Sequence, residues 1–205
     1  MAKQQEEFAP VLRLASASPR RRQLLDLIGV PHVVLPADID ETPHVAEPAE
    51  QYVMRLAREK ACAIWARHQD LPVLAADTTV VVDQEILGKP ESASDAELML
   101  TKLSGRTHVV HTGVALRTAQ GVTVAISTTS VSFAPLTAAQ IRAYWASGEP
   151  QGKVGAYAIQ GLGALFVSGI SGSYTGVMGL PLFETAALLR AHDVPVWSGA
   201  LKGAQ

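Results

Sequence analysis

The sequence predicts an α/β fold in which a second lobe follows the first half of the chain. Short apolar strand patterns alternate with helical patterns between Val11 and Leu103. The segments 108–116 and 122–133 are rich in Val and Thr and flank Ala119-Gln120-Gly121, which is typical of a β-hairpin. With 205 residues, of which 48% are hydrophobic, the chain can bury a sizeable core.

Composition restricts the partners that we expect. The net charge is −2 and 18% of residues are charged, so no overall basic field attracts nucleic acid or an anionic membrane. An anion site must be a local cluster, which favours a small ligand. No apolar run is long enough to span a bilayer, the polar segment 1–10 lacks the apolar core of a signal peptide, and the single Cys62 fits a reducing compartment and a packing role. We therefore expect a cytoplasmic protein.

Ordered structure is expected to begin at Val11, after a flexible polar extension over residues 1–10. Val11–Ala15 is a short strand pattern. Ser16–Pro19 is typical of a loop and N-cap, because Pro is favoured at the first helical position. The helix that follows is expected to end at Gly29.

Arg20, Arg21 and Arg22 occupy the first turn of this helix, where the helix dipole is positive. Each cation there is disfavoured by roughly 0.3 to 1 kcal/mol at an exposed site. A bound anion reverses that sign, because backbone N–H groups, the Ser16 and Ser18 hydroxyls and a guanidinium converge on it. Phosphate is the obvious candidate. The alternative is that the arginines extend into solvent, which fits Arg22 best and Arg21 next.

A second short strand, His32–Leu35, leads into an acidic loop, Asp38–Pro43, that has no apolar periodicity. Such a loop is usually solvated. Beside a phosphate site, however, one of its carboxylates could hold a divalent cation. The loop by itself leaves both alternatives open.

The longest helical pattern, Pro48–His68, contains a misplaced lysine. Its apolar residues recur at spacings of three and four, and Lys60 lies about 20° around the helix from Val53, near the middle of the apolar stripe. Lys60 could extend along the core surface with its ammonium in water. Alternatively, its ammonium reaches an interior cleft that holds an anion.

The apolar, β-branched run Val73–Val82 predicts a buried strand with Asp77 in its middle. An ionised carboxylate is costly there unless it is paired or bound to a cation. The structural alternative is a carboxylate that accepts hydrogen bonds from backbone amides at a kink. A functional Asp77 requires cationic partners, and the arginines and Lys60 are candidates.

Two capping boxes predict further helices. Ser94 with Glu97 predicts a helix that continues to Leu103, and Thr137 with Gln140 predicts one that ends near Gly148. These helices enclose the predicted hairpin, which together with them would form the second lobe.

Glycines interrupt the apolar runs that follow Gly152, which indicates tight turns or close approach of the backbone to a ligand. A last helix is expected to begin after Gly179–Pro181 and to end near His192. We therefore expect one domain over residues 11–192, with two lobes around a cleft, and a C-terminal tail over residues 193–205.

Seven short motifs follow one another along the chain: Leu14-Ala15-Ser16-Ala17-Ser18-Pro19-Arg20-Arg21, Glu41-Thr42-Pro43, Ala57-Arg58-Glu59-Lys60-Ala61, Ala76-Asp77-Thr78, Gly88-Lys89-Pro90, Ser104-Gly105-Arg106-Thr107-His108 and Gly155-Ala156-Tyr157-Ala158-Ile159-Gln160-Gly161. From about Val11 to His192 they resemble one known family, the Maf family of nucleoside triphosphate pyrophosphatases. Each motif alone would be weak, but their order along the chain makes the resemblance specific. It implies an α/β fold similar to inosine triphosphate pyrophosphatases, with a mixed, strongly twisted central sheet flanked by helices. It also implies a divalent cation, Mg²⁺ or Mn²⁺, and hydrolysis of a nucleoside triphosphate to the monophosphate and pyrophosphate.

The resemblance also implies roles for individual residues. Asp77 would be the catalytic general base or a metal-binding carboxylate, and Glu41 would be the second metal-binding carboxylate. These roles leave open whether Asp77 activates the attacking water itself or holds the ion that does so. The implied phosphate-binding residues are Ser16, Arg20, Lys60 and Lys89.

Substrate choice is implied by two short motifs. Asp77-Thr78 and Ile159-Gln160-Gly161 are similar to those of members that act on dTTP and UTP, and modified pyrimidine nucleotides are further candidates. The branch that acts on 7-methyl-GTP carries Asp-Gln and Phe-Lys-Ser-Glu-Gly instead. The implied specificity residues are Arg20, Thr78 and Gln160. For Gln160 the structural alternative is an amide that stabilises a glycine-rich turn.

A second hypothesis is a non-catalytic nucleotide-binding regulator of cell division, because the family is associated with septum formation. The carboxylates Glu41 and Asp77 argue against it, since a simple anion binder gains nothing from negative charge beside phosphates. A nucleic-acid binder is poorly supported, because no basic stripe interleaved with aromatic residues occurs. A homodimer is the assembly that the family suggests.

Overall fold

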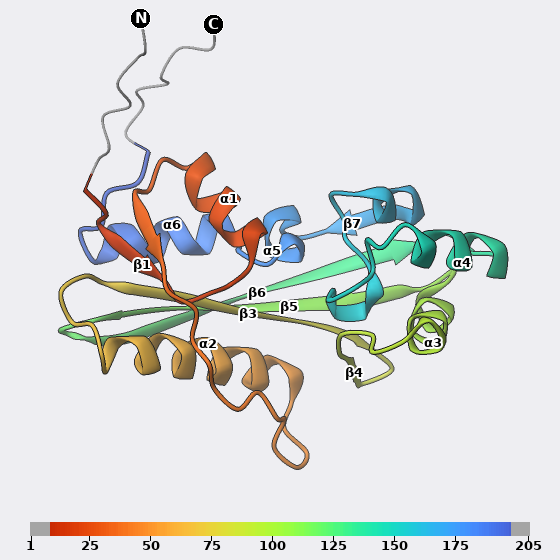
Figure 1. Ribbon diagram of the computed structural model, residues 1–205, viewed down its shortest axis with the longest axis horizontal. Helices are drawn as coiled ribbons and strands as arrows, with labels where there is room; N and C mark the ends of the chain where they lie inside the picture. Colours follow the sequence, from red (N-terminus) through yellow and green to blue (C-terminus); the bar gives the residue numbers. More distant parts are fainter. Residues whose placement is uncertain (1–8, 198–205) are drawn as a thin grey trace, which may run out of the picture.

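The computed structural model describes residues 9–197 and contains one mixed sheet with helices on both faces (Figure 1). Six of its seven strands lie in the order β2-β1-β3-β5-β6-β7, and β4 pairs with β3. β1 pairs in parallel with β2 and β3, whereas the other pairs are antiparallel. The predicted α/β class and mixed sheet are confirmed. The expectations for residues 1–8 and 198–205 lie outside the described residues.

The elements have the following bounds. The strands are β1 (Leu12–Leu14), β2 (His32–Val34), β3 (Val73–Val82), β4 (Glu85–Leu87), β5 (Thr107–Thr118), β6 (Gly121–Phe133) and β7 (Val167–Ser171). The α-helices are α1 (Pro19–Leu27), α2 (Ala49–Trp65), α3 (Ala93–Leu103), α4 (Ala138–Ala146), α5 (Tyr174–Met178) and α6 (Leu182–Ala191), and two short 3-10 helices are η1 (Val154–Ala156) and η2 (Leu162–Phe166).

Of the three predicted N-caps, two are confirmed and one is wrong. Ser18 caps α1, and Thr137 with Gln140 forms the predicted capping box of α4. The capping box predicted at Ser94 is wrong, because α3 begins two residues earlier and its cap is Ser92, whose hydroxyl accepts from the Asp95 amide at 3.1 Å. Ser94 is itself helical.

Two strands, β4 and β7, one α-helix, α5, and the two 3-10 helices were not predicted. β4 forms a tight hairpin with the end of β3, and the two turn residues, Asp83 and Gln84, both have positive φ, as this turn requires. Among the described strands β7 pairs with β6 alone, and most of its residues are exposed. An exposed edge strand of this kind lacks the apolar alternation by which a strand is predicted.

The buried core divides into an end with β1 and an end with α3. At the first end, α2 packs on one face of β3 and β5, while α1 and α6 pack on the other (Figure 1). At the second end, α3, α4 and η1 surround aromatic residues that include Phe133 and Tyr157. Both ends belong to one continuous sheet, and the division into two lobes stays a prediction.

The C-terminal segment packs on this core as far as it is described. Val194 is buried against the cluster beneath α1 and α6, and the Trp197 amide donates to the Ile28 carbonyl at 2.9 Å. In the described part of the chain, no helix combines the length and the apolar character needed to cross a bilayer.

Candidate active site

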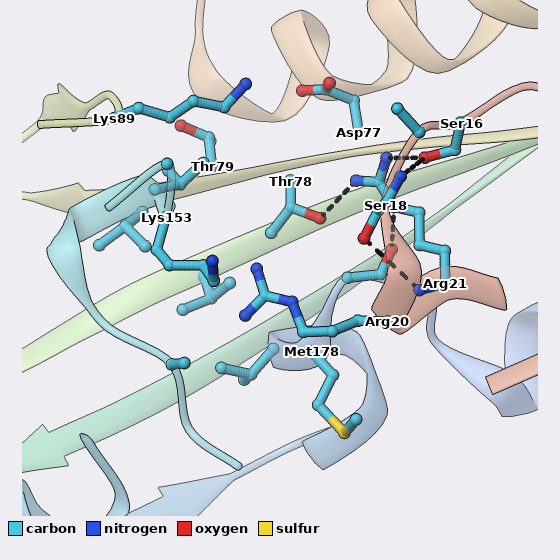
Figure 2. A pocket seen from close by; sticks show the side chains of 18 of the residues that line it. Ser16, Ser18, Arg20, Arg21, Asp77, Thr78, Thr79, Lys89, Lys153 and Met178 are labelled. Atoms are coloured by element: carbon cyan, nitrogen blue, oxygen red, sulfur yellow. Dashed lines mark hydrogen bonds between the residues drawn. The ribbon is translucent and has the colours of Figure 1, made fainter. Parts of the chain in front are cut away.

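A cleft of about 820 Å³ lies beside β3 (Figure 2). The start of α1, the acidic loop, α2, β3, the segment after β4, the loops before and after η1, and the end of α5 all contribute to its lining. The structure thus brings together every residue that the sequence predicted for the site. They are Ser16, Arg20, Glu41, Lys60, Asp77, Thr78, Lys89 and Gln160.

A gap in the sheet lets the cleft reach both faces of β3. β1 pairs with Val73 and Leu74, and β4 pairs with residues 80–82. Between them, in the described structure, β5 is the only strand that pairs with residues 75–79. Because side chains alternate along a strand, Asp77 and Thr79 lie on the face that α2 covers, whereas Thr78 lies on the opposite face (Figure 2).

Asp77 and Lys60 form a buried ion pair on the α2 face. The Lys60 ammonium lies 2.6 Å from Asp77 Oδ1 and 2.8 Å from Glu41 Oε1, and both Lys60 and Asp77 are 7% exposed. Lys60 therefore reaches the interior cleft and does not extend into water. Burial raises the pKa of Asp77, although the charges of Lys60 and Arg21 oppose that rise. A carboxylate with a raised pKa is better suited to accept a proton near neutral pH.

Glu41 is held by the start of α2. The Tyr52 hydroxyl donates to the Glu41 carbonyl at 2.9 Å, and Arg55 donates to the Thr42 carbonyl at 3.2 Å. Arg55 also donates to both carboxylate oxygens of Glu47, at 2.7 Å each, and so anchors the segment between the acidic loop and α2. Burial alone would raise the pKa of Glu41, but the hydrogen bond and charge of Lys60 lower it overall.

Arg21 occupies the opposite face of β3. Its guanidinium donates to Ser16 Oγ at 3.1 Å, to Thr78 Oγ1 at 3.2 Å and to the Gly179 carbonyl at 2.7 Å (Figure 2). Arg21 therefore does not extend into solvent, which was the alternative left open for it, whereas Arg22 is exposed as that alternative expected. Arg21 ties the start of α1 to β3 and to the end of α5.

The Thr78 hydroxyl belongs to this network. It lies 3.0 Å from the hydroxyl of Thr112, its neighbour in register on β5, and Thr112 donates to the Gly176 carbonyl at 2.8 Å. Thr78 thus orients Arg21 as well as lining the cleft. The sequence showed the arginine run but not which arginine faces the sheet.

Arg20 and Lys153 extend into the cleft near one another (Figure 2). Among residues 9–197, no side chain forms a hydrogen bond or ion pair with either of them, and the Lys153 ammonium contacts only the Gln151 carbonyl, at 3.2 Å. Burial lowers the pKa of both groups, and the charge of Arg20 lowers that of Lys153 further. Two unpaired cations that face one cleft form a site for an anion. The sequence reasoning missed Lys153.

Two carboxylates are available for a metal ion. Within the described residues there is no group of three or more His, Cys, Asp or Glu side chains that could hold one. The Glu41 and Asp77 oxygens converge on one cation, the Lys60 ammonium. This donor set fits Mg²⁺, which commonly takes one or two carboxylates and completes its shell with substrate phosphates and water.

The sequence comparisons identify the family. The profile of a family described as "Maf-like protein" matches residues 11–192. The chain belongs to the Maf family. Relatives from Methylobacillus flagellatus, Myxococcus xanthus and Bordetella parapertussis are 58%, 53% and 54% identical to it. The matches cover 89%, 91% and 91% of this chain and 93%, 94% and 95% of those relatives, each of which is named dTTP/UTP pyrophosphatase.

Among solved structures, the Ham1 protein of Staphylococcus aureus overlaps with this Maf-family chain. The overlap covers 60% of this chain and 71% of that protein, at a TM-score of 0.46 and 17% sequence identity.

Proposed function

We propose that this Maf-family protein hydrolyses dTTP and UTP between the α- and β-phosphates and releases the nucleoside monophosphate and pyrophosphate. The observation that supports it best is the position of Asp77, a buried carboxylate beside unpaired cations in one cleft. A triphosphate requires such cations, whereas a buried carboxylate beside them serves catalysis better than binding alone. The names of relatives that are 53–58% identical support the same reaction.

The chemistry assigned to the protein is a displacement at the α-phosphorus. Asp77 accepts a proton from a water molecule, whose oxygen forms a bond to that phosphorus. The bond from the α-phosphorus to the bridging oxygen breaks, and pyrophosphate leaves with the electron pair. Lys60 keeps Asp77 oriented and compensates the negative charge of its carboxylate until that group accepts the proton.

The triphosphate charge would be compensated by cations that have no acidic partner in the described chain. Arg20, Lys89 and Lys153 line the cleft, and Ser16 adds a hydroxyl at the start of α1. Glu41 and Asp77 would hold Mg²⁺ or Mn²⁺, which when bound neutralises phosphate charge and acidifies water. Lys60 already neutralises two carboxylates, so we assign it to them first and to phosphate second.

Base selection is assigned to the face of β3 that carries Thr78. The Gln160 side chain is exposed, lines the cleft and forms no hydrogen bond within the described structure, so its amide is free to donate and accept. A pyrimidine edge presents both a donor and acceptors to such a group. Thr78 and Arg20, which line the same cleft, would complete the contact.

Pyrophosphate release tests this proposal. Purified protein would be assayed against the common ribo- and deoxyribonucleoside triphosphates with Mg²⁺, with Mn²⁺ and with excess EDTA. Preferential release from dTTP and UTP is expected. A preference for a purine nucleotide would overturn the substrate assignment, and tight nucleotide binding without pyrophosphate would favour the regulatory hypothesis.

A further inference from the structure

The carboxylate of Glu149, a residue outside the loop that carries Gln160, binds the backbone of that loop. Glu149 follows α4 and lines the same cleft. Its Oε2 accepts from the Leu162 amide at 2.8 Å, and its Oε1 accepts from the Gly163 amide at 2.9 Å. Both amides lie directly after Gln160 and Gly161 along the chain.

Tyr144, on α4, extends this contact to the other side of Gln160. Its hydroxyl donates to Glu149 Oε1 at 2.7 Å and accepts from the Ala158 amide at 3.1 Å. The pair Glu149–Tyr144 therefore binds the loop two residues before Gln160 and two and three residues after it. The Gln160 side chain itself remains unbonded within residues 9–197.

Two glycines make room for the pair. A Cβ atom on Gly161 would overlap the Glu149 carboxylate, and one on Gly163 would lie 2.7 Å from both the Tyr144 hydroxyl and the Ala158 carbonyl. Contacts this short do not occur for real Cβ atoms, so a side chain at position 161 would displace the Glu149 carboxylate, and one at position 163 would also force the loop backbone to move. This accounts for part of the glycine-rich composition noted in the sequence.

The charge of Glu149 suits it to hold backbone amides. Burial alone would raise its pKa, but hydrogen bonds from Tyr144, Gly163 and Leu162 together lower the pKa overall. Burial, followed by the bond to Glu149, raises the pKa of Tyr144, so its hydroxyl keeps the proton that it donates. Three donors already use the carboxylate, which is therefore not placed to accept a proton from substrate.

We propose that Glu149, together with Tyr144, is a positioning residue that sets nucleobase selectivity by fixing the loop on which Gln160 stands. This inference rests on the proposed function, because it takes Gln160 as the group that contacts the base. The pair acts through the loop backbone and leaves Asp77 and its partners unaffected.

The test compares Glu149→Gln with wild type and with Glu97→Gln, an α3 carboxylate outside the cleft. The amide keeps the shape of Glu149 but places an N–H opposite one loop amide. We expect kcat/KM for dTTP to fall about tenfold, mainly through KM, and the preference for dTTP over dGTP to fall toward that of Gln160→Ala. The double variant Glu149→Gln/Gln160→Ala should lose no more selectivity than Gln160→Ala alone. Tyr144→Phe should also lower the preference for dTTP over dGTP.

Hydrogen exchange gives a measurement that does not depend on turnover. The Leu162 and Gly163 amides should exchange faster in Glu149→Gln than in wild type, while amides of β5 should not change. Unchanged exchange in this loop would overturn the inference, as would equal loss of kcat/KM for every nucleotide or additive effects with Gln160→Ala. If wild type releases no pyrophosphate, the proposed function fails separately, and binding of α,β-imido-dUTP by the same variants still tests the positioning role.

Discussion

Gly113 lies directly opposite Asp77 in the sheet, and its missing side chain lets α2 approach the strands closely enough for Lys60 to reach Asp77. The two residues are partners in register between β3 and β5. A Cβ atom on Gly113 would lie 2.5 Å from the Val53 carbonyl oxygen of α2. The ion pair at the centre of the cleft thus depends on a glycine one strand away.

Replacing Gly113 with Ala should weaken both stability and activity. Backbone atoms of α2 must move, at a cost of about 1 to 3 kcal/mol, and Lys60 moves with them. Denaturant unfolding and pyrophosphate release would measure the two effects. Gly169→Ala is the matched control, because its nearest neighbour would be an ordinary 3.9 Å contact; equal behaviour of the two variants would contradict the expectation.

Asp77 should control the acid limb of the pH dependence of kcat. Because burial raises its pKa above the ordinary 3.8, activity should be lost on the acid side at a higher pH than for a solvated aspartate. Asp77→Asn should lower kcat by roughly a hundred- to ten-thousand-fold and should remove that limb. A folded Asn variant that retains near wild-type turnover would exclude Asp77 as the base.

Lys153 should contribute to nucleotide binding. Lys153→Met keeps the apolar stem but removes an unpaired cation, so KM for dTTP should rise about tenfold with a smaller change in kcat. Lys102→Met, a surface lysine paired with Glu85 and outside the cleft, should have no effect on KM. If both variants bind dTTP as wild type does, Lys153 is not part of the anion site.

Glu41 should determine the affinity for the divalent cation. Glu41→Gln removes one of two convergent carboxylates, and we expect about tenfold weaker Mn²⁺ binding in the presence of α,β-imido-dUTP, measured by electron paramagnetic resonance. The control is Asp38→Asn, because Asp38 lies in the same loop but is exposed and does not line the cleft. It should bind Mn²⁺ normally, and equal weakening in both variants would point to a general charge effect.

His108 should make the fold sensitive to acid. It is 2% exposed, its Nε2 bonds the Tyr157 hydroxyl at 2.8 Å, and burial lowers its pKa from 6.5 to about 4. Because the folded protein binds a proton at His108 less readily than the unfolded chain does, the free energy of unfolding is unaffected by this group above pH 6.5. It decreases as the pH falls toward 4, by roughly 3 kcal/mol in total. His108→Gln, which keeps a partner for Tyr157 and does not titrate, should flatten the unfolding free energy over that window.

Much of the fold and the site could be predicted from local pattern. Lys60 and Asp77 stood out because each placed a charge in an apolar pattern, and the structure pairs them. Their catalytic roles stay predictions. Motif order along the chain then added Glu41, Lys89 and Gln160, which have no local signal of this kind.

The remaining features of the site depend on how helices and loops pack in three dimensions, which local sequence patterns do not show. Whether Arg20 or Arg21 faces the sheet is decided by how α1 is rotated against β3. Lys153 follows no periodic element, so only tertiary structure brings it to the cleft. The cap of α3 was misplaced because Ser92 and Ser94 are both good caps, and each has an acidic residue three positions later.

The strands that flank the interruption beside β3 restrict which molecules can pair with it. The Ala15 amide donates to the Leu74 carbonyl, so by alternation the backbone groups of Ala76 and Thr78 point toward the interruption. An unpaired stretch of strand normally invites pairing with a strand of another molecule. Here β1 and β4 close both ends of the stretch, so a foreign strand cannot align with it while a small ligand can still reach its amides and carbonyls.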